Sequence, residues 1–540
     1  MTTRRDFVSS TGLGLAALGL PALRLQSATA YDLIIRGAAI YGAPGELSTA
    51  GKEMDVAVSA GRIVKVGRKF LENGREEIDG RGLALAPGFI DIHSHADGNL
   101  TDDPRAESVI RQGVTTVVVG QDGGSHVPAK DGTTSFRTYF KRVEALPSAV
   151  NVASMVGLGQ VREIVVGEDN RPATPKELVR MTALVEKALA SGACGASTGL
   201  EYSPGAFASR EELIALCRPL RARRLPYATH MRNEDDTLIE AIDEAVAIAR
   251  GARCPLQISH LKTAGARNWN KIDAVFARIA AAEKAGLDVT FDRYPYVAWS
   301  TGLTNMFPVW ALDGGDDAFL KRLTDSATAE RVRTESADKA AMIGGWHNVQ
   351  LSNVAAPGDS DAVGKRLDDW GRTRGLEPYD AAVRLLQNST NNVSTVVFAM
   401  SEENLERFLA HPKCMICSDG GSFALTGAAR EGHPHPRGLG TFPRVLGRYV
   451  RERKVITLAQ AVDKMSGMPA RRLRLSGRGK IAPGAWADLV LFDPATVADT
   501  ATFEDPFQYP VGIPTVVVNG KIALRDGERV GVGNGKALRK

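Results

Sequence analysis

The pattern of hydrophobic and polar positions changes twice along the chain. Residues 31–40, 55–58 and 62–67 form short apolar or alternating runs separated by turns, and residues 487–492 and 514–521 have the same character. Runs of this kind are typical of β-strands. Because strands occur at both ends, with a long and different segment between them, we expect one β-rich domain to which both ends contribute.

The middle of the chain alternates strand-like and helical runs. Apolar runs at 115–119, 256–259, 287–291 and 415–418 predict buried strands. A helix is expected over 174–189, because it opens with the capping-box pattern Thr-Pro-Lys-Glu. Repetition of strand and then helix favours a (β/α)₈ barrel of the TIM type over a doubly wound sheet.

These patterns together predict an α/β fold in two parts. The barrel is expected over 87–475, with a more polar and less periodic insertion at about 305–365. A small β-sandwich domain is expected from 31–86 and 476–540 together.

The first thirty residues have the features of an export signal. Arg4 and Arg5 form a twin-arginine pattern, an apolar stretch follows at 12–20, and small residues at 28–30 offer a cleavage site. A membrane-anchoring helix is the alternative, but the apolar stretch is too short to span a bilayer. We therefore expect a signal peptide over 1–30 and a periplasmic or secreted protein.

Charge and cysteine content exclude some classes of partner. The chain has 67 Lys and Arg against 62 Asp and Glu, interspersed, which gives no case for a nucleic-acid surface. After removal of the signal we also expect no membrane contact; the oligomeric state is left open. Five cysteines are few and odd in number for a disulfide framework, and the C-x-x-C at 414–417 is better explained as strand than as a redox or zinc motif.

Candidate chemistry begins with His93 and His95. They follow the apolar run at 83–92, which predicts a buried strand entered through a Pro-Gly turn. Side chains alternate along a strand, so both imidazoles are expected to point the same way. Two such imidazoles form half of a divalent-metal site, although this motif alone is equally consistent with a structural pair.

Four further polar residues each follow a strand-like run: Asp122, His230, His260 and Asp419. Barrel enzymes carry their chemistry at the carboxyl ends of the strands. Any one of these residues alone is better explained as a satisfied strand-end group. Together with the two histidines, however, they predict a metal centre.

These residues lie in motifs of a known family. The chain resembles the N-acyl-D-amino-acid deacylases, or D-aminoacylases, of the amidohydrolase superfamily. The resemblance runs from about residue 31 to residue 540, and its motifs are PGFIDIHSH, GVTTVVVG, TGLEYSPGA, HMR, ISHLK, FDRYPY and HPHPRGLGTFPR. The histidine pair is shared across the superfamily, whereas EYSPGAFA and HPHPRGLGTFPR are much narrower.

The resemblance implies a metal-dependent active site. His230 and His260 are expected to hold one tightly bound zinc, and His93 and His95 to face a second metal position. Asp419 is expected to take the proton from metal-activated water and deliver it to the leaving nitrogen, as general base and then general acid.

The resemblance also implies the substrate. Tyr202, Lys262 and Arg437 match positions expected to hold the carboxylate of a D-amino acid, and convergent cations with a hydroxyl suit that group. The implied reaction hydrolyses an N-acyl-D-amino acid to a carboxylate and a free D-amino acid.

Two departures from the family pattern stand out. Asp122, in Gln-Asp-Gly, replaces a zinc-ligating cysteine, and a harder oxygen ligand predicts more exchangeable binding of one or two ions, with manganese or cobalt tolerated beside zinc. His126 is a candidate extra ligand but is better explained as a loop residue. Leu158 replaces a histidine, which predicts a more apolar pocket or a shifted acyl preference.

Other functions are weighed against this one. One alternative cleaves dipeptides with a C-terminal D-residue, and another opens cyclic amides such as hydantoins, which lack the free carboxylate that the clamp residues would hold. A third is a catalytically silent binding protein on the same scaffold. The preferred side chain is open; Arg232 and Arg267 are candidate partners for an acidic one.

Overall fold

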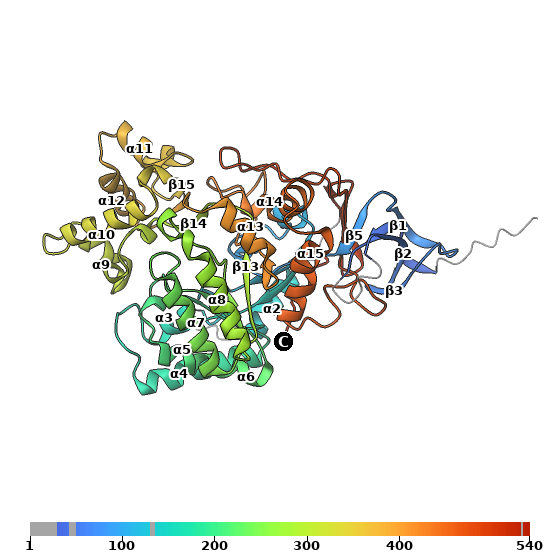
Figure 1. The fold of residues 1–540 in the computed structure, drawn as a ribbon, viewed down its shortest axis with the longest axis horizontal. Helices are drawn as coiled ribbons and strands as arrows, with labels where there is room; N and C mark the ends of the chain where they lie inside the picture. Colours follow the sequence, from blue (N-terminus) through green and yellow to red (C-terminus); the bar gives the residue numbers. More distant parts are fainter. Residues whose placement is uncertain (1–29, 43–49, 130–134, 531–532) are drawn as a thin grey trace, which may run out of the picture.

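The computed structural model describes residues 30–42, 50–129, 135–530 and 533–540. Figure 1 shows a central body of strands and helices, with a helical extension on one side and a β-sheet region on the other. The predicted signal peptide lies, apart from its last residue, outside the described residues, so export stays a prediction.

Parallel strands form the central body in two sheets. The first is ordered β6 (Phe89–Asp91), β7 (Val114–Val119) and β8 (Asn151–Ser154). The second is ordered β9 (Val156–Gly157), β10 (Ala196–Gly199), β11 (Tyr227–His230), β12 (Leu256–Ile258), β13 (Val289–Arg293) and β17 (Cys414–Ile416). Only Met155 separates β8 from β9, and the Ser418 backbone N–H donates to Asp91 Oδ1 at 2.8 Å. This arrangement is consistent with the expected TIM-like α/β body, while closure of a complete barrel stays a prediction.

Helices connect these strands and cover the sheets. They are α1 (Glu107–Ile110), α2 (Phe136–Ala145), α3 (Leu158–Val165), α4 (Pro175–Ala190), α5 (Arg210–Cys217), α6 (Leu220–Arg223), α7 (Leu238–Ala252), α8 (Ile272–Lys284), α13 (Glu402–Ala410), α14 (Arg437–Arg444), α15 (Leu458–Val462) and α16 (Met468–Arg472). The predicted helix at 174–189 is confirmed as α4, and the Thr174 and Glu177 side chains form both hydrogen bonds of its capping box.

The single strand predicted over 83–92 is wrong. The chain forms β5 (Ala84–Pro87), which pairs with the terminal sheet, and then β6, which pairs with the central body. Gly88 separates them and packs so closely on Thr115 that a Cβ there would lie 2.3 Å from Thr115 Cγ2. The glycine therefore lets the backbone pass from one sheet to the other.

Strands from both ends of the chain form one nine-stranded sheet. Its order is β21 (Glu528–Arg529), β20 (Lys521–Arg525), β19 (Thr515–Val518), β18 (Leu489–Phe492), β5, β1 (Tyr31–Ile40), β2 (Lys52–Ser59) and β3 (Arg62–Gly67), with β4 (Gly74–Asp79) also on β1. Both ends of the chain therefore contribute strands to this one sheet, whereas the composite domain stays a prediction. A sandwich of two packed sheets is a finer statement and stays a prediction.

The helical extension lies between β13 and β17 in the sequence. It contains an antiparallel sheet of β14 (Trp299–Gly302), β16 (Val393–Val397) and β15 (Val349–Val354), with α9 (Gly315–Arg322), α10 (Ala329–Met342), α11 (Leu367–Thr373) and α12 (Pro378–Asn388). In Figure 1 it stands out from the body at upper left. The insertion predicted at 305–365 is narrower than this unit, which runs from β14 at Trp299 to β16 at Val397.

A buried polar cluster joins the nine-stranded sheet to β8. Asp488 accepts hydrogen bonds from the Asn519 backbone N–H at 2.7 Å and from the Arg478 guanidinium. Arg478 also donates to Asn519 Oδ1 at 2.9 Å, and Asn519 Nδ2 donates to Asn151 Oδ1 at 2.8 Å. We call these four residues the junction cluster.

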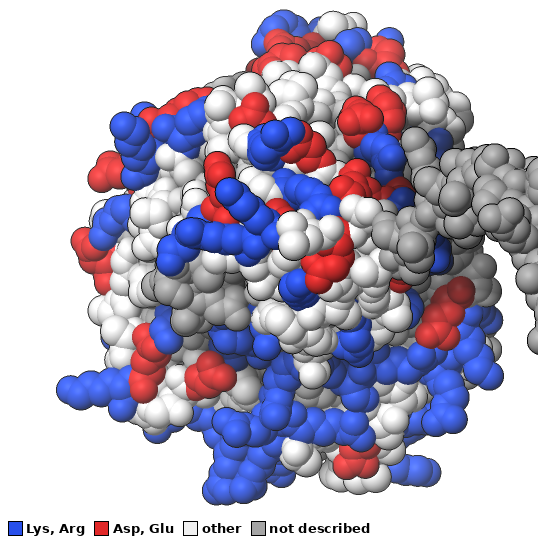
Figure 2. All heavy atoms as spheres, turned by 90° about the vertical axis from the view of Figure 1, so that its right-hand side faces the viewer, with Lys and Arg blue, Asp and Glu red and all other residues white. Residues whose placement is uncertain are grey.

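The surface and the cysteines complete the description. In Figure 2 both signs of charge mix over the upper part of one face, while Lys and Arg predominate below, so the expected interspersion holds for part of that face only. All five cysteines are buried and unbridged, as expected for structural residues. No helix in the described part of the chain is long and apolar enough to cross a membrane.

Candidate metal centre and active site

Four side chains converge where parallel strands end. His93 follows β6, Asp122 follows β7, and His260 and Asp419 follow β12 and β17. One ligand atom from each lies within 4.8 Å of the others. The strand-end placement expected from the sequence therefore brings these residues into one group. We call these four residues and His95 the ligand ring.

Atoms of the ligand ring lie close together, but several of them lack hydrogen-bond partners. His93 Nε2 lies 3.3 Å from Asp122 Oδ2 and 3.3 Å from Asp419 Oδ1. His95 Nε2 lies 3.3 and 3.1 Å from the same two oxygens. Even so, both ring nitrogens of His93 and Asp122 Oδ1 are buried without a hydrogen-bond partner. Buried polar atoms are normally paired, so these convergent nitrogen and oxygen donors fit a divalent cation.

A second group of candidate ligands adjoins the first. It consists of His230, Glu234 and His260. His230 Nδ1 lies 3.1 Å from His260 Nε2, and that same His260 atom lies 3.6 Å from Asp122 Oδ2. Because His260 belongs to both groups, the residues could hold one ion or two neighbouring ions.

The backbone is strained at three residues of the ligand ring. Asp122, His260 and Asp419 have φ values of 50°, 32° and 50°. This left-handed region is unfavourable for residues with a side chain, and such strain concentrates at functional sites. Each strand thus turns sharply as it ends, at the residue whose side chain joins the group.

Opposite charges shift the pKa values of the ligand ring. Burial opposes protonation of His95, but Asp122 and Asp419 outweigh it and raise its pKa to about 9. Burial opposes ionisation of Asp419, but Arg437, His260 and His93 hold its pKa well below the ordinary value. Asp419 is therefore ionised at neutral pH, the form a general base requires.

Sequence reasoning missed three carboxylates behind the histidines. Glu234 Oε1 lies 3.0 Å from His260 Nδ1, Glu201 Oε2 lies 3.3 Å from His230 Nε2, and Asp292 Oδ1 accepts from the His260 backbone N–H at 2.8 Å. Carboxylates of this kind fix the orientation of ligand imidazoles. Asp292 and Glu201 stand inside the motifs FDRYPY and EYSPGA, which were the available signal.

The predicted carboxylate-binding residues are placed differently from one another. Arg437 Nη1 lies 2.7 Å from Asp419 Oδ2 and lines a cavity of about 220 Å³ that also contains His95. Its Nη2 lies 3.4 Å from Ser300 O, and the Tyr202 hydroxyl lies 3.2 Å from Oγ1 of the next residue, Thr301. Both side chains thus reach the same stretch of β14.

Lys262 does not join them. It is buried, its Nζ lies 2.5 Å from Glu234 Oε2, and it lies 2.8 Å from His260 Nδ1. Its expected contact with a substrate carboxylate stays a prediction.

The two remaining candidates lie at the edge of the site. His126 Nε2 is 3.1 Å from Asp97 O, and its ring stacks on Tyr139, so it belongs to neither ligand group among the described residues. Leu158 is buried at the start of α3, directly after β9. Its effect on acyl preference stays a prediction.

Known proteins are similar to this chain over most of its length. The model of the amidohydrolase family matches residues 76–394 and 424–524. The D-aminoacylase of Alcaligenes xylosoxydans xylosoxydans is 35% identical over 94% of this chain and 97% of its own length.

Solved structures are similar over the same length. An N-acyl-D-glutamate deacylase from Bordetella bronchiseptica, complexed with zinc and a phosphonate that mimics the tetrahedral intermediate, has a TM-score of 0.80 and 33% identity, covering 94% of this chain and 100% of that one. A D-aminoacylase structure described by its binuclear metal centre has the same TM-score and coverage at 36% identity.

Proposed function

The chain belongs to the amidohydrolase family, and from this premise we propose that it is a metal-dependent deacylase of N-acyl-D-amino acids. It would release a carboxylate and a free D-amino acid. The observation that carries the proposal is the ligand ring, in which histidine and aspartate side chains converge while both ring nitrogens of His93 and Asp122 Oδ1 are buried without a hydrogen-bond partner. A purely structural cluster would pair these atoms.

Five side chains would hold the metal: His93, His95, Asp122, His230 and His260. When bound, zinc, or manganese or cobalt in its place, supplies Lewis-acid polarisation of the amide carbonyl and of water. Because Asp122 offers carboxylate oxygen in place of thiolate sulfur, we propose that the ions exchange more readily here than in relatives with cysteine.

Asp419 would move the proton. Its Oδ1 faces His93 and His95, where water and the scissile amide would meet, while its Oδ2 faces Arg437. Ionised Asp419 accepts the proton of the attacking water and returns it to the leaving nitrogen.

Arg437 and Tyr202 would fix the substrate. Both reach consecutive residues of β14, so a carboxylate between them is held at a defined place beside the ligand ring. With the carboxylate and the amide both fixed, only one configuration at the α-carbon places its side chain without a clash, which supports selectivity for the D-form.

Finer features of the molecule belong to the same proposal. The two parallel sheets would close into one (β/α)₈ barrel, and the terminal sheet would be part of a β-sandwich. The enzyme would be exported by the twin-arginine route and act in the periplasm or outside the cell.

The test is a hydrolysis assay of residues 31–540 with its metal content measured, comparing N-acetyl-D- and N-acetyl-L-amino acids. Turnover of the D-forms alone, with divalent metal bound, is expected. A dipeptide ending in a D-residue and a hydantoin belong in the same panel. Turnover of the hydantoin alone would contradict the proposal, because it has no carboxylate for Arg437.

A further inference from the structure

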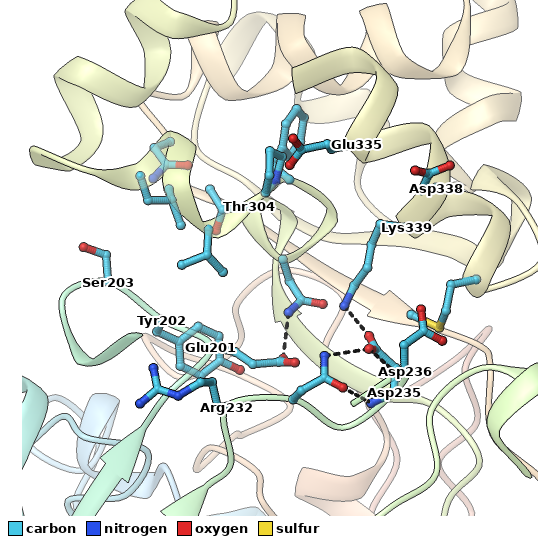
Figure 3. A pocket seen from close by; sticks show the side chains of 18 of the residues that line it. Glu201, Tyr202, Ser203, Arg232, Asp235, Asp236, Thr304, Glu335, Asp338 and Lys339 are labelled. Atoms are coloured by element: carbon cyan, nitrogen blue, oxygen red, sulfur yellow. Dashed lines mark hydrogen bonds and ion pairs between the residues drawn. The ribbon is translucent and has the colours of Figure 1, made fainter. Parts of the chain in front are cut away.

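A larger cavity opens beside the ligand ring. It has a volume of about 410 Å³ and lies between the strand ends of the body and the helical extension. Tyr202 and Glu201 form its floor in Figure 3, and Lys339 of α10 points down into it from above. Glu201 contacts His230, which in turn contacts His260 of the ligand ring, so this cavity lies next to the site. We call it the acidic cavity.

Carboxylates outnumber cations in its lining by seven to three. The seven are Glu168, Glu201, Asp235, Asp236, Asp316, Glu335 and Asp338, and the three cations are Arg232, Arg267 and Lys339. The cavity therefore presents an excess of four negative charges.

All three cations are already bound to carboxylates. Arg232 Nε lies 2.9 Å from Glu244 Oε2, and its guanidinium also donates to two backbone carbonyls. Arg267 makes a two-point contact with Asp236, with Nε to Oδ1 at 2.7 Å. Lys339 Nζ lies 2.6 Å from Asp235 Oδ2. Thus neither arginine considered for an acidic side chain offers it an uncompensated positive charge.

The smaller cavity offers no alternative. Among the described residues that line it, Arg437 is the one Lys or Arg side chain, and it is paired with Asp419 and expected to hold the α-carboxylate of the substrate. His435 lines the same cavity, but burial and then Arg437 hold its pKa well below the usual value, so it is neutral. Glu431 adds a further negative charge.

From this charge distribution we infer that the enzyme acts on N-acyl-D-amino acids with an uncharged or basic side chain and discriminates against D-aspartate and D-glutamate. The inference rests on the proposed function. Whichever cavity receives the side chain, a second carboxylate would lose water without gaining a cation and would meet like charges. A basic side chain would be attracted instead.

The charge state of Lys339 supports the acidic character of the cavity. Burial alone would lower its pKa, but Glu201 and Asp235 outweigh burial and raise it. Lys339 therefore stays charged and bound to Asp235. The similar N-acyl-D-glutamate deacylase shows that the fold can take an acidic substrate. The protein side chains that line the cavities must therefore decide which substrate side chain is preferred.

An isosteric pair of substrates gives the test. On the zinc-loaded enzyme, kcat/KM for N-acetyl-D-glutamine is expected to exceed that for N-acetyl-D-glutamate by about 100-fold, since the two differ chiefly in charge. N-acetyl-D-lysine is expected to be turned over at least as well as N-acetyl-D-glutamine. The same order is expected for the pair N-acetyl-D-asparagine and N-acetyl-D-aspartate.

A variant that releases one cation sharpens the test. Asp236→Asn removes the partner of Arg267, and about half of the Asp236 side chain is exposed, so the fold should tolerate the change. Its selectivity for glutamine over glutamate is expected to fall about 10-fold. Asp236→Asn combined with Arg267→Gln should restore the original ratio. The matched control is Asp316→Asn, because Asp316 lines the same cavity but contacts Asn391 and, among the described residues, no ion-pair partner.

Each outcome is decisive. Equal turnover of N-acetyl-D-glutamate and N-acetyl-D-glutamine would overturn this inference and leave the deacylase function standing. No turnover of any N-acyl-D-amino acid would overturn both. The inference would also be contradicted if turnover of N-acetyl-D-glutamate rose in Asp236→Asn and stayed raised when Arg267→Gln was added. The increase would then not come from the released cation.

Discussion

The ligand ring and the junction cluster are two buried polar groups that differ in whether their polar atoms have hydrogen-bond partners. In the junction cluster, Asp488, Arg478 and Asn519 exchange hydrogen bonds with one another, and none of their side-chain atoms is among the buried atoms without a partner. In the ligand ring, both nitrogens of His93 and one oxygen of Asp122 lack partners.

The difference separates a structural cluster from a binding site. Both groups lie in the interior, and both contain opposite charges, so charge and burial alone do not distinguish them. In a cluster that only supports the fold, the polar groups hydrogen-bond one another, because each unpaired buried group lowers the free energy of unfolding. A cluster built for a ligand keeps its donors and acceptors for that ligand.

The most direct way to break this comparison is to remove the carboxylate that would do the chemistry. Asp419→Asn is expected to lower kcat by about 10³-fold, because the amide cannot accept a proton from water. Bound metal, measured by elemental analysis, should stay nearly unchanged. Retained activity would refute the role of Asp419 and place the proton transfer elsewhere.

Replacing Asp122 separates metal binding from chemistry. Asp122→Asn removes the negative charge shared by His93 and His260, and loss of a ligand should weaken metal binding by about 100-fold or more. Asp122→Cys should hold zinc more tightly, because thiolate is the softer ligand. Dialysis against a chelator, followed by metal analysis, measures both. A natural protein that keeps a single zinc through this dialysis would contradict the exchangeable site.

The junction cluster should respond in the opposite way. Asp488→Asn leaves the Arg478 guanidinium buried without its counter-charge, and the free energy of unfolding is expected to fall by about 3 kcal/mol. The kcat value should not change. Denaturant unfolding measures the loss, with the exposed pair of Asp79 and Arg81 as a control: Asp79→Asn should have no measurable effect.

The protonation of its histidines should make both stability and metal binding at the ligand ring depend on pH. The pKa of His95 is raised from 6.5 to about 9, so its protonated form stabilises the metal-free fold below pH 6.5, and this contribution is lost as the pH rises towards 9. A metal needs neutral imidazoles, and against the effect of burial Asp122 and Asp419 also raise the pKa of His93 well above its ordinary value, so the number of protons released on binding at pH 8 should exceed one. Calorimetry in buffers of different ionisation enthalpy counts them. Metal affinity that did not rise with pH would contradict this assignment.

Local patterns predicted the polar strand ends but not what lies behind them. Asp122 and Asp419 were predictable because each lies within three residues of the end of an apolar strand run. Glu234 and Asp292 were not assigned roles, because their partners are His260 and His93 on other strands, and no spacing along the chain encodes that contact. The placement of Lys262 against Glu234 is equally a property of the fold.

The break at Gly88 and the width of the extension were missed for a similar reason. An apolar run records that its residues are buried, but it does not record which sheet buries them. β5 and β6 are both fully buried and differ only in their neighbours. In the same way, residues 299–302 and 393–397 lay within the predicted barrel, but β14 and β16 pair antiparallel with each other in a separate sheet.

The nine-stranded sheet also has a consequence for the order of folding. During synthesis β1 and β5 leave the ribosome long before β18, the neighbour of β5 in the finished sheet, has been made. Until then β5 presents an open edge that could pair with another chain. The amino-terminal strands therefore depend on residues near the other end for protection, and a nascent chain stalled within the central body would be exposed to aggregation at this edge.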